Sequence, residues 1–154
     1  MTNLAYSVER LYPVTVETLW NAWTNAQALQ EWYCPPNMLV KTDSTLSNPE
    51  EGGLWKNAVE APENMGTAYF WGRYQTVEPF AKAEHTLFYS TEEADFDAAD
   101  ESGPSHLVVL DFEARDGGAW VRYSQLGEMP AEMAEGARMG METYLDNLHK
   151  FLSK

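Results

Sequence analysis

The 154-residue chain carries 24 acidic residues against 10 basic ones, a net charge of -14, and 44% of its residues are hydrophobic. This composition excludes a disordered chain and predicts one domain, residues 1–154, with a substantial core. An acidic surface repels phosphate backbones and anionic headgroups, so neither nucleic acid nor a membrane is an expected partner.

The cysteine content and the lengths of the apolar runs indicate the cellular compartment of the protein. The single cysteine, Cys34, excludes an intrachain disulfide. No signal-peptide pattern and no run of 18 apolar residues is present, so we expect a cytoplasmic protein that does not span a membrane.

The first part of the chain predicts a strand followed by two short helices. Partial alternation indicates a strand over residues 4–14. Thr15 is a suitable N-cap for an amphipathic helix through Trp23. Thr24 opens a segment with capping-box spacing, which predicts a second helix that ends before Pro35-Pro36.

The middle of the chain has a period of two, which is typical of strands. Turn signals interrupt it around residues 47–53, 61–64, 79–80 and 115–118, and residues 92–104 form a polar, acidic loop. The predicted strands are residues 37–43, 54–60, 66–78, 82–91, 107–114 and 119–126.

The last segment, residues 130–151, predicts one long amphipathic helix. Its expected buried face is Met133, Ala137, Met141, Tyr144, Leu148 and Phe151. Gly136 and Gly140 each cost about 1 kcal/mol in a helix, so we expect something to lie close to the helix at these positions.

This order of elements predicts an α+β fold in which a curved antiparallel sheet of about six to seven strands surrounds the C-terminal helix. Two short helices follow the first strand. A curved sheet around a single helix leaves space between them, so a cavity is expected there.

Four stretches of the sequence resemble the START-like (SRPBCC) superfamily, and within it the group named for the activator of heat-shock-protein ATPase homologue. They are Glu9-Arg10 with Pro13, Leu19-Trp20, Ala22-Trp23-Thr24 and Trp32-Tyr33; Gly52-Gly53; Gly72-Arg73-Tyr74 with Val77 and Pro79; and Gly140-Met141 with Tyr144-Leu145 and Leu148. The resemblance covers nearly the whole chain and implies the helix-grip fold. It also implies an internal cavity that binds apolar small molecules. Some branches of the superfamily are cyclases or hydratases.

The expected cavity wall is rich in aromatic residues and methionine, which suit adaptable apolar pockets. Arg73 and Tyr74 point to opposite faces of their strand, and we favour Tyr74 inward and Arg73 in solvent. Tyr69 and Trp71 face inward with Tyr74 only if Gly72 marks a β-bulge. The candidate wall residues are Trp32, Trp55, Tyr69, Trp71, Tyr74, His85, Tyr89, Met133, Ala137, Met141 and Tyr144.

No cofactor or metal is expected. The acidic segment 92–101 lacks the glycine and the final carboxylate of an EF-hand loop, and no Cys/His cluster, phosphate loop or nucleophile elbow occurs. A solvated loop or a partner-contact loop is the simpler interpretation of this segment.

The preferred hypothesis for function is binding of a small hydrophobic molecule in the cavity. One alternative is a cyclase or hydratase that uses the pair His85 and Tyr74, although no catalytic residue can be assigned. Another is a co-chaperone or other protein-binding module with a chaperone partner, acting through the outer surface, and a homodimer is also possible.

Overall fold

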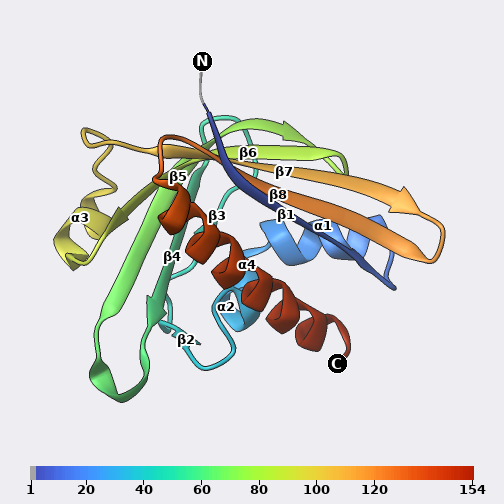
Figure 1. The fold of residues 1–154 in the computed structure, drawn as a ribbon, viewed down its shortest axis with the longest axis horizontal. Helices are drawn as coiled ribbons and strands as arrows, with labels where there is room; N and C mark the ends of the chain where they lie inside the picture. Colours follow the sequence, from blue (N-terminus) through green and yellow to red (C-terminus); the bar gives the residue numbers. More distant parts are fainter. Residues whose placement is uncertain (1–2) are drawn as a thin grey trace.

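The computed structural model describes residues 3–154, apart from the side chain of residue 64. In this part of the chain, eight strands form one curved antiparallel sheet in the order β1-β8-β7-β6-β5-β4-β2, and β3 pairs with β4 (Figure 1). The strands are β1 (Leu4–Tyr12), β2 (Leu39–Val40), β3 (Leu46–Ser47), β4 (Leu54–Glu60), β5 (Thr67–Glu78), β6 (Lys82–Ser90), β7 (His106–Arg115) and β8 (Gly118–Leu126). The predicted fold class is confirmed.

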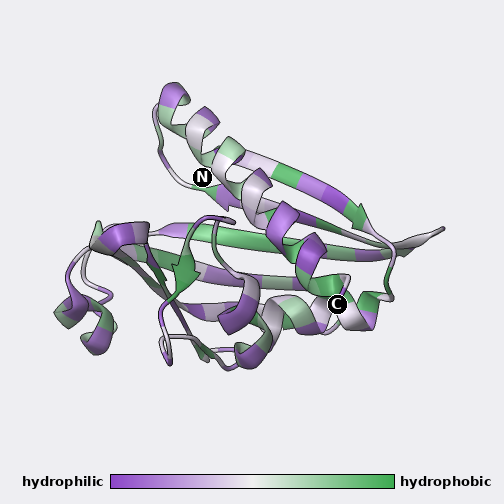
Figure 2. Ribbon diagram, turned by 90° about the horizontal axis from the view of Figure 1, so that it is seen from below, coloured by the Kyte–Doolittle hydropathy of each residue, from purple (hydrophilic) through white to green (hydrophobic). Residues whose placement is uncertain are grey.

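The long C-terminal helix crosses the concave side of the sheet, with two short helices beside it (Figure 1). The helices are α1 (Val16–Thr24), α2 (Ala26–Trp32), α3 (Glu93–Ala98), α4 (Ala131–Leu152) and the 3₁₀ turn η1 (Pro62–Asn64). Along the strands, hydrophobic and hydrophilic positions alternate (Figure 2), as expected for a sheet whose faces have different surroundings.

The N-caps of the two short helices are formed by side chains. The Thr15 hydroxyl accepts a hydrogen bond from the Thr18 amide at 3.2 Å, as the sequence predicted. The second helix begins one residue later than predicted, because Asn25 caps it by accepting from the Ala28 amide at 3.1 Å. The Thr24 hydroxyl instead donates back to the Trp20 carbonyl at 2.8 Å.

The main core lies between α4, the short helices and the sheet. Trp23, Trp32, Leu145 and Leu148 are at most 2% exposed within it. The predicted buried face of α4 is therefore partly correct, but Met133 is 61% exposed because the first turns of the helix extend past the core.

Helix α3 was not predicted. Its single large apolar side chain, Phe96, packs against Tyr69 and Trp71 on the convex side of the sheet, where Phe88 completes a small second core. Lys56 donates to the Phe96 carbonyl at 2.6 Å. The segment is helical because tertiary contacts hold it, which an acidic composition does not reveal.

Candidate ligand-binding pocket

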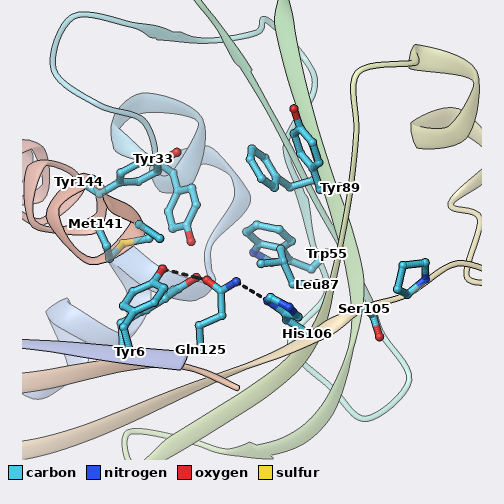
Figure 3. Close-up of a pocket in the computed structure, with 15 residues that line it drawn as sticks. Tyr6, Tyr33, Trp55, Leu87, Tyr89, Ser105, His106, Gln125, Met141 and Tyr144 are labelled. Carbon is cyan, nitrogen blue, oxygen red and sulfur yellow. Dashed lines mark hydrogen bonds between the residues drawn. The ribbon is translucent and has the colours of Figure 1, made fainter. Parts of the chain in front are cut away.

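A pocket of about 570 Å³ lies between the N-terminal half of α4 and the concave side of the sheet. Its residues come from β1, β4, β5, β6, β7, β8, α4, the end of α2 and the segment before β7 (Figure 3). They are Tyr6, Tyr33, Trp55, Phe70, Leu87, Tyr89, Pro104, Ser105, His106, Tyr123, Gln125, Ala137, Gly140, Met141 and Tyr144. This volume is typical of small-molecule sites.

Aromatic rings in edge-to-face contact form most of one wall. The Tyr33 ring centroid lies 5.1 Å from that of Tyr144 and 5.6 Å from that of Trp55, with interplanar angles of 74° and 78°. Trp55 in turn stacks on His85 at 4.5 Å. Buried rings fixed by such contacts present a largely preformed surface to a ligand.

A polar cluster crosses the opposite side of the pocket. The Tyr6 hydroxyl donates to Oε1 of Gln125 at 2.8 Å, and the Tyr123 hydroxyl approaches the same oxygen at 3.4 Å. Nε2 of Gln125 lies 2.7 Å from Nδ1 of His106. Figure 3 shows the Tyr33 hydroxyl pointing towards Tyr6 and Gln125 from the other wall.

The phenols of this cluster stay protonated. Burial raises the pKa of Tyr6 to about 12 and raises the pKa values of Tyr33 and Tyr123 well above the usual value for tyrosine. Desolvation disfavours the phenolate in each case. No Asp, Glu, Lys or Arg occurs among the described residues that line the pocket, so its wall is polar in places but uncharged.

The α4 side of the pocket is formed partly by small residues. A Cβ placed on Gly140 would meet no heavy atom outside the helix within 4 Å, and the same is true of Gly136. Contrary to the expectation that something lies close to the helix at these glycines, no other part of the described chain does. Gly140 instead borders the open volume of the pocket, which a larger side chain would reduce.

Five of the eleven predicted wall residues lie on this pocket: Trp55, Tyr89, Ala137, Met141 and Tyr144. Trp55 and Met141 are 2% and 7% exposed, whereas Tyr89 is 60% exposed at the rim.

Tyr69 and Trp71 are placed on the convex side, which corrects the expectation for both. The pairing of β4 with β5 runs without interruption through Trp55 and Gly72, so no bulge there rotates these residues inward. Gly72 instead allows close approach of the Thr86 carbonyl. The register of β5 shifts only after Tyr74, against β6.

Strand β5 does turn Tyr74 inward and Arg73 outward, as we favoured. Tyr74 is 2% exposed but is not among the residues that line the pocket. Its hydroxyl is hydrogen-bonded to Ser47 Oγ at 2.8 Å. Arg73 forms an ion pair with Glu101 at 2.8 Å.

Trp32, His85 and Met133 also lie outside the pocket lining. Trp32 belongs to the core and donates to the Ala22 carbonyl at 2.8 Å. His85 is stacked on Trp55 and its Nδ1 lies 2.7 Å from the Thr86 carbonyl. Burial lowers the pKa of His85 to about 4, so it is neutral near pH 7.

The sequence interpretation missed the polar cluster. In β8, Val121, Tyr123 and Gln125 alternate with outward residues, so a glutamine continues an apolar face. That feature is a usable signal of a binding site, because a buried amide needs partners. The partners themselves, Tyr6 and His106, are brought to it only by the pairing of β1 and β7 with β8.

Within residues 3–154, no group of three or more His, Cys, Asp or Glu side chains is arranged to hold a metal ion. The same residues contain no helix long and apolar enough to cross a membrane.

A curved antiparallel sheet around one long C-terminal helix, with a pocket between them, defines the START-like helix-grip class of proteins. The chain belongs to the family described as activator of Hsp90 ATPase homolog 1-like protein, whose pattern it matches over residues 13–153. A comparison with curated proteins found no significant match.

Solved structures share the fold. The AHSA1 protein from Silicibacter pomeroyi superposes with a TM-score of 0.81 at 20% identity, over 96% of each chain. A protein from Staphylococcus epidermidis superposes with a TM-score of 0.78 at 23% identity, over 99% of this chain and 91% of that one. A protein from Chromobacterium violaceum superposes with a TM-score of 0.78 at 19% identity, over 94% of each chain. Identities this low support the fold and nothing finer.

Proposed function

We propose that the protein binds a small, largely apolar molecule in the pocket beneath the N-terminal half of α4. The observation that carries the proposal is the pocket itself: about 570 Å³, walled by aromatic rings, with a few converging polar groups and no charged side chain in its described lining. Apolar walls with few polar groups are the usual composition of small-molecule sites.

A test needs a variant that fills the pocket and a control that leaves it open. Gly140→Leu places an isobutyl group at the pocket wall, and the same change at Gly136 lies one helical turn away, outside the lining. We expect 2-ethylnaphthalene to bind the wild type and Gly136→Leu, measured by isothermal titration calorimetry. Gly140→Leu should bind it at least about tenfold more weakly, because the occupied volume excludes the ring system.

A second measurement addresses a natural ligand. Mass spectrometry under native and denaturing conditions would reveal a molecule that is released only on unfolding. If neither naphthalene binding nor a released molecule is found, the proposal is contradicted.

The geometry gives less support to the enzymatic alternative that uses His85 and Tyr74. Their ring centroids are 5.7 Å apart, the Tyr74 hydroxyl is hydrogen-bonded to Ser47, and Nδ1 of His85 is hydrogen-bonded to the Thr86 carbonyl. Neither residue lines the pocket.

A co-chaperone role, suggested by the family description, would use the outer surface. In the acidic segment, Glu93 pairs with Lys41 at 2.6 Å and Glu101 pairs with Arg73, so part of its charge is already neutralised within the chain. The described residues of this surface carry no feature that favours a chaperone partner over the pocket ligand.

A further inference from the structure

The directions of the hydrogen bonds in the polar cluster determine what the pocket offers to a ligand. Oε1 of Gln125 accepts from Tyr6 at 2.8 Å and is also the acceptor nearest to the Tyr123 hydroxyl, at 3.4 Å. The amide nitrogen Nε2 is only a donor, so Nδ1 of His106, 2.7 Å away, accepts from it and the His106 proton sits on Nε2.

This arrangement commits the protons of two phenols to one amide oxygen. Each phenolic oxygen still has lone pairs that can accept hydrogen bonds. Tyr6 and Tyr123 both line the pocket, so these lone pairs adjoin the space that a ligand would occupy. Figure 3 shows the Tyr6 hydroxyl beside Gln125 at the wall of this space. Tyr6, Tyr123 and Gln125 therefore present acceptors to a ligand on this side of the pocket, whereas the Tyr33 hydroxyl on the other wall and Nε2–H of His106 remain donors.

The lack of charged side chains in the described lining further restricts the class of ligand. An anionic ligand would lose its hydration without meeting a Lys or Arg among the described lining residues, and the whole chain carries a net charge of -14. A cationic ligand would meet no Asp or Glu in the same lining. Burial of an unpaired charge is costly in either case.

We infer that the pocket selects a neutral, ring-containing molecule that donates a hydrogen bond from an O–H or N–H group to Tyr6 and Tyr123. This inference rests on the ligand-binding function proposed above. Gln125 is the specificity-determining residue, because its Oε1 orients both phenolic protons away from the ligand, and His106 holds the amide in that orientation.

Four naphthalenes that differ in one substituent test this inference at pH 7, with affinities from calorimetry on the full chain. 2-Naphthol donates a hydrogen bond, 2-acetylnaphthalene only accepts one, 2-ethylnaphthalene does neither, and 2-naphthoate is an anion. We expect 2-naphthol to bind about fivefold more tightly than 2-ethylnaphthalene, the value of one net hydrogen bond. The acetyl compound should gain less affinity over the ethyl compound than 2-naphthol does, and the naphthoate should bind the most weakly.

Variants of the cluster assign the effect to its residues. Tyr6→Phe should remove most of the affinity advantage of 2-naphthol without weakening the binding of 2-ethylnaphthalene. Tyr69→Phe, on the convex side of the sheet and outside the pocket lining, should change neither affinity. Gln125→Leu frees the phenolic protons, so it should shift the preference towards 2-acetylnaphthalene. Circular dichroism establishes that each variant is folded. If Gln125→Leu does not fold, the affinities of the wild type and of Tyr6→Phe for the four compounds still test the inference.

The outcomes separate the two proposals. Binding of 2-ethylnaphthalene with no preference for 2-naphthol, or with a preference for 2-acetylnaphthalene or 2-naphthoate, overturns the inference and leaves the proposed function intact. Binding of none of the four overturns the inference, and it contradicts the proposed function as well when mass spectrometry finds no molecule released on unfolding. The preference for 2-naphthol, lost in Tyr6→Phe and kept in Tyr69→Phe, supports both.

Discussion

The Tyr12 hydroxyl donates a hydrogen bond to the main-chain carbonyl of Leu145 at 2.8 Å, and both residues are at most 1% exposed. This contact joins the last residue of β1 to the middle of α4. Burial raises the pKa of Tyr12, so the phenol remains a donor at all physiological pH values.

Loss of this hydroxyl should weaken the attachment of the helix to the sheet. In Tyr12→Phe we expect the free energy of unfolding to fall by about 1 kcal/mol, the usual net value of a hydrogen bond. Urea unfolding measures this change in free energy. If the urea concentration at the midpoint and the slope of the transition are both unchanged, the hydrogen bond contributes nothing to stability.

The two halves of α4 should differ in mobility. Near its C-terminal end, Asp146 pairs with Arg10 at 2.7 Å and Asn147 donates to the Trp32 carbonyl at 2.9 Å. Among the described residues, those from 131 to 140 form no side-chain hydrogen bond to another element, because the bonds of Glu135, Arg138 and Gly140 stay within the helix. We expect faster amide hydrogen exchange over 136–140 than over 144–149, and protection of the first segment by a pocket ligand. Equal exchange in both segments would contradict this.

The two helix glycines should respond alike in stability and differently in binding. Gly136→Ala and Gly140→Ala each add a methyl group into open space, so each should raise the free energy of unfolding by up to about 1 kcal/mol through helix propensity. Only Gly140→Ala reduces the volume of the pocket, so it should weaken the binding of 2-ethylnaphthalene, whereas Gly136→Ala should not. Thermal melting and calorimetry measure the two effects, and destabilisation by either change would show that the surrounding space is filled.

The phase of α4 is tested by placing a charge on each of two methionines. Met141 is 7% exposed in the core, so Met141→Asp should cost several kcal/mol, on the order of 3, because it buries an unpaired carboxylate. Met133→Asp, at a position 61% exposed, should change stability by less than about 0.5 kcal/mol. Denaturant titration of both variants suffices, and equal effects would contradict the observed phase.

Local patterns in the sequence predicted the elements and much of the helix face of the pocket. Alternation placed Trp55 inward, and helical spacing placed Ala137, Met141 and Tyr144 together. Tyr69 was misplaced because the sequence allowed a bulge at Gly72, and only the pairing of β4 with β5 decides that question.

The polar cluster required tertiary information. Tyr6 lies on β1, which is distant in sequence from β8, and no local pattern fixes the pairing of these two strands. His106 and Gln125 lie at the open end of the β7–β8 hairpin, whose turn the sequence indicates but whose register only the structure gives. Helix α3 was missed for the same reason, since the contact of Phe96 with Trp71 depends on the folding of the chain back over the sheet.

His85 should make the stability of the fold depend on pH. Its pKa falls from the ordinary 6.5 to about 4 because burial disfavours the imidazolium, so below pH 6.5 the unfolded state binds a proton that the folded state does not. Stability contributed by neutral His85 is complete above pH 6.5 and is lost as the pH falls towards 4, by about 2 kcal/mol at pH 5.

His85→Phe keeps a ring against Trp55 and removes the titration. Urea unfolding of both proteins between pH 7.5 and 5 should therefore give a steeper loss for the wild type than for the variant. Parallel curves would show that His85 is not held neutral, because the remaining groups titrate in both proteins.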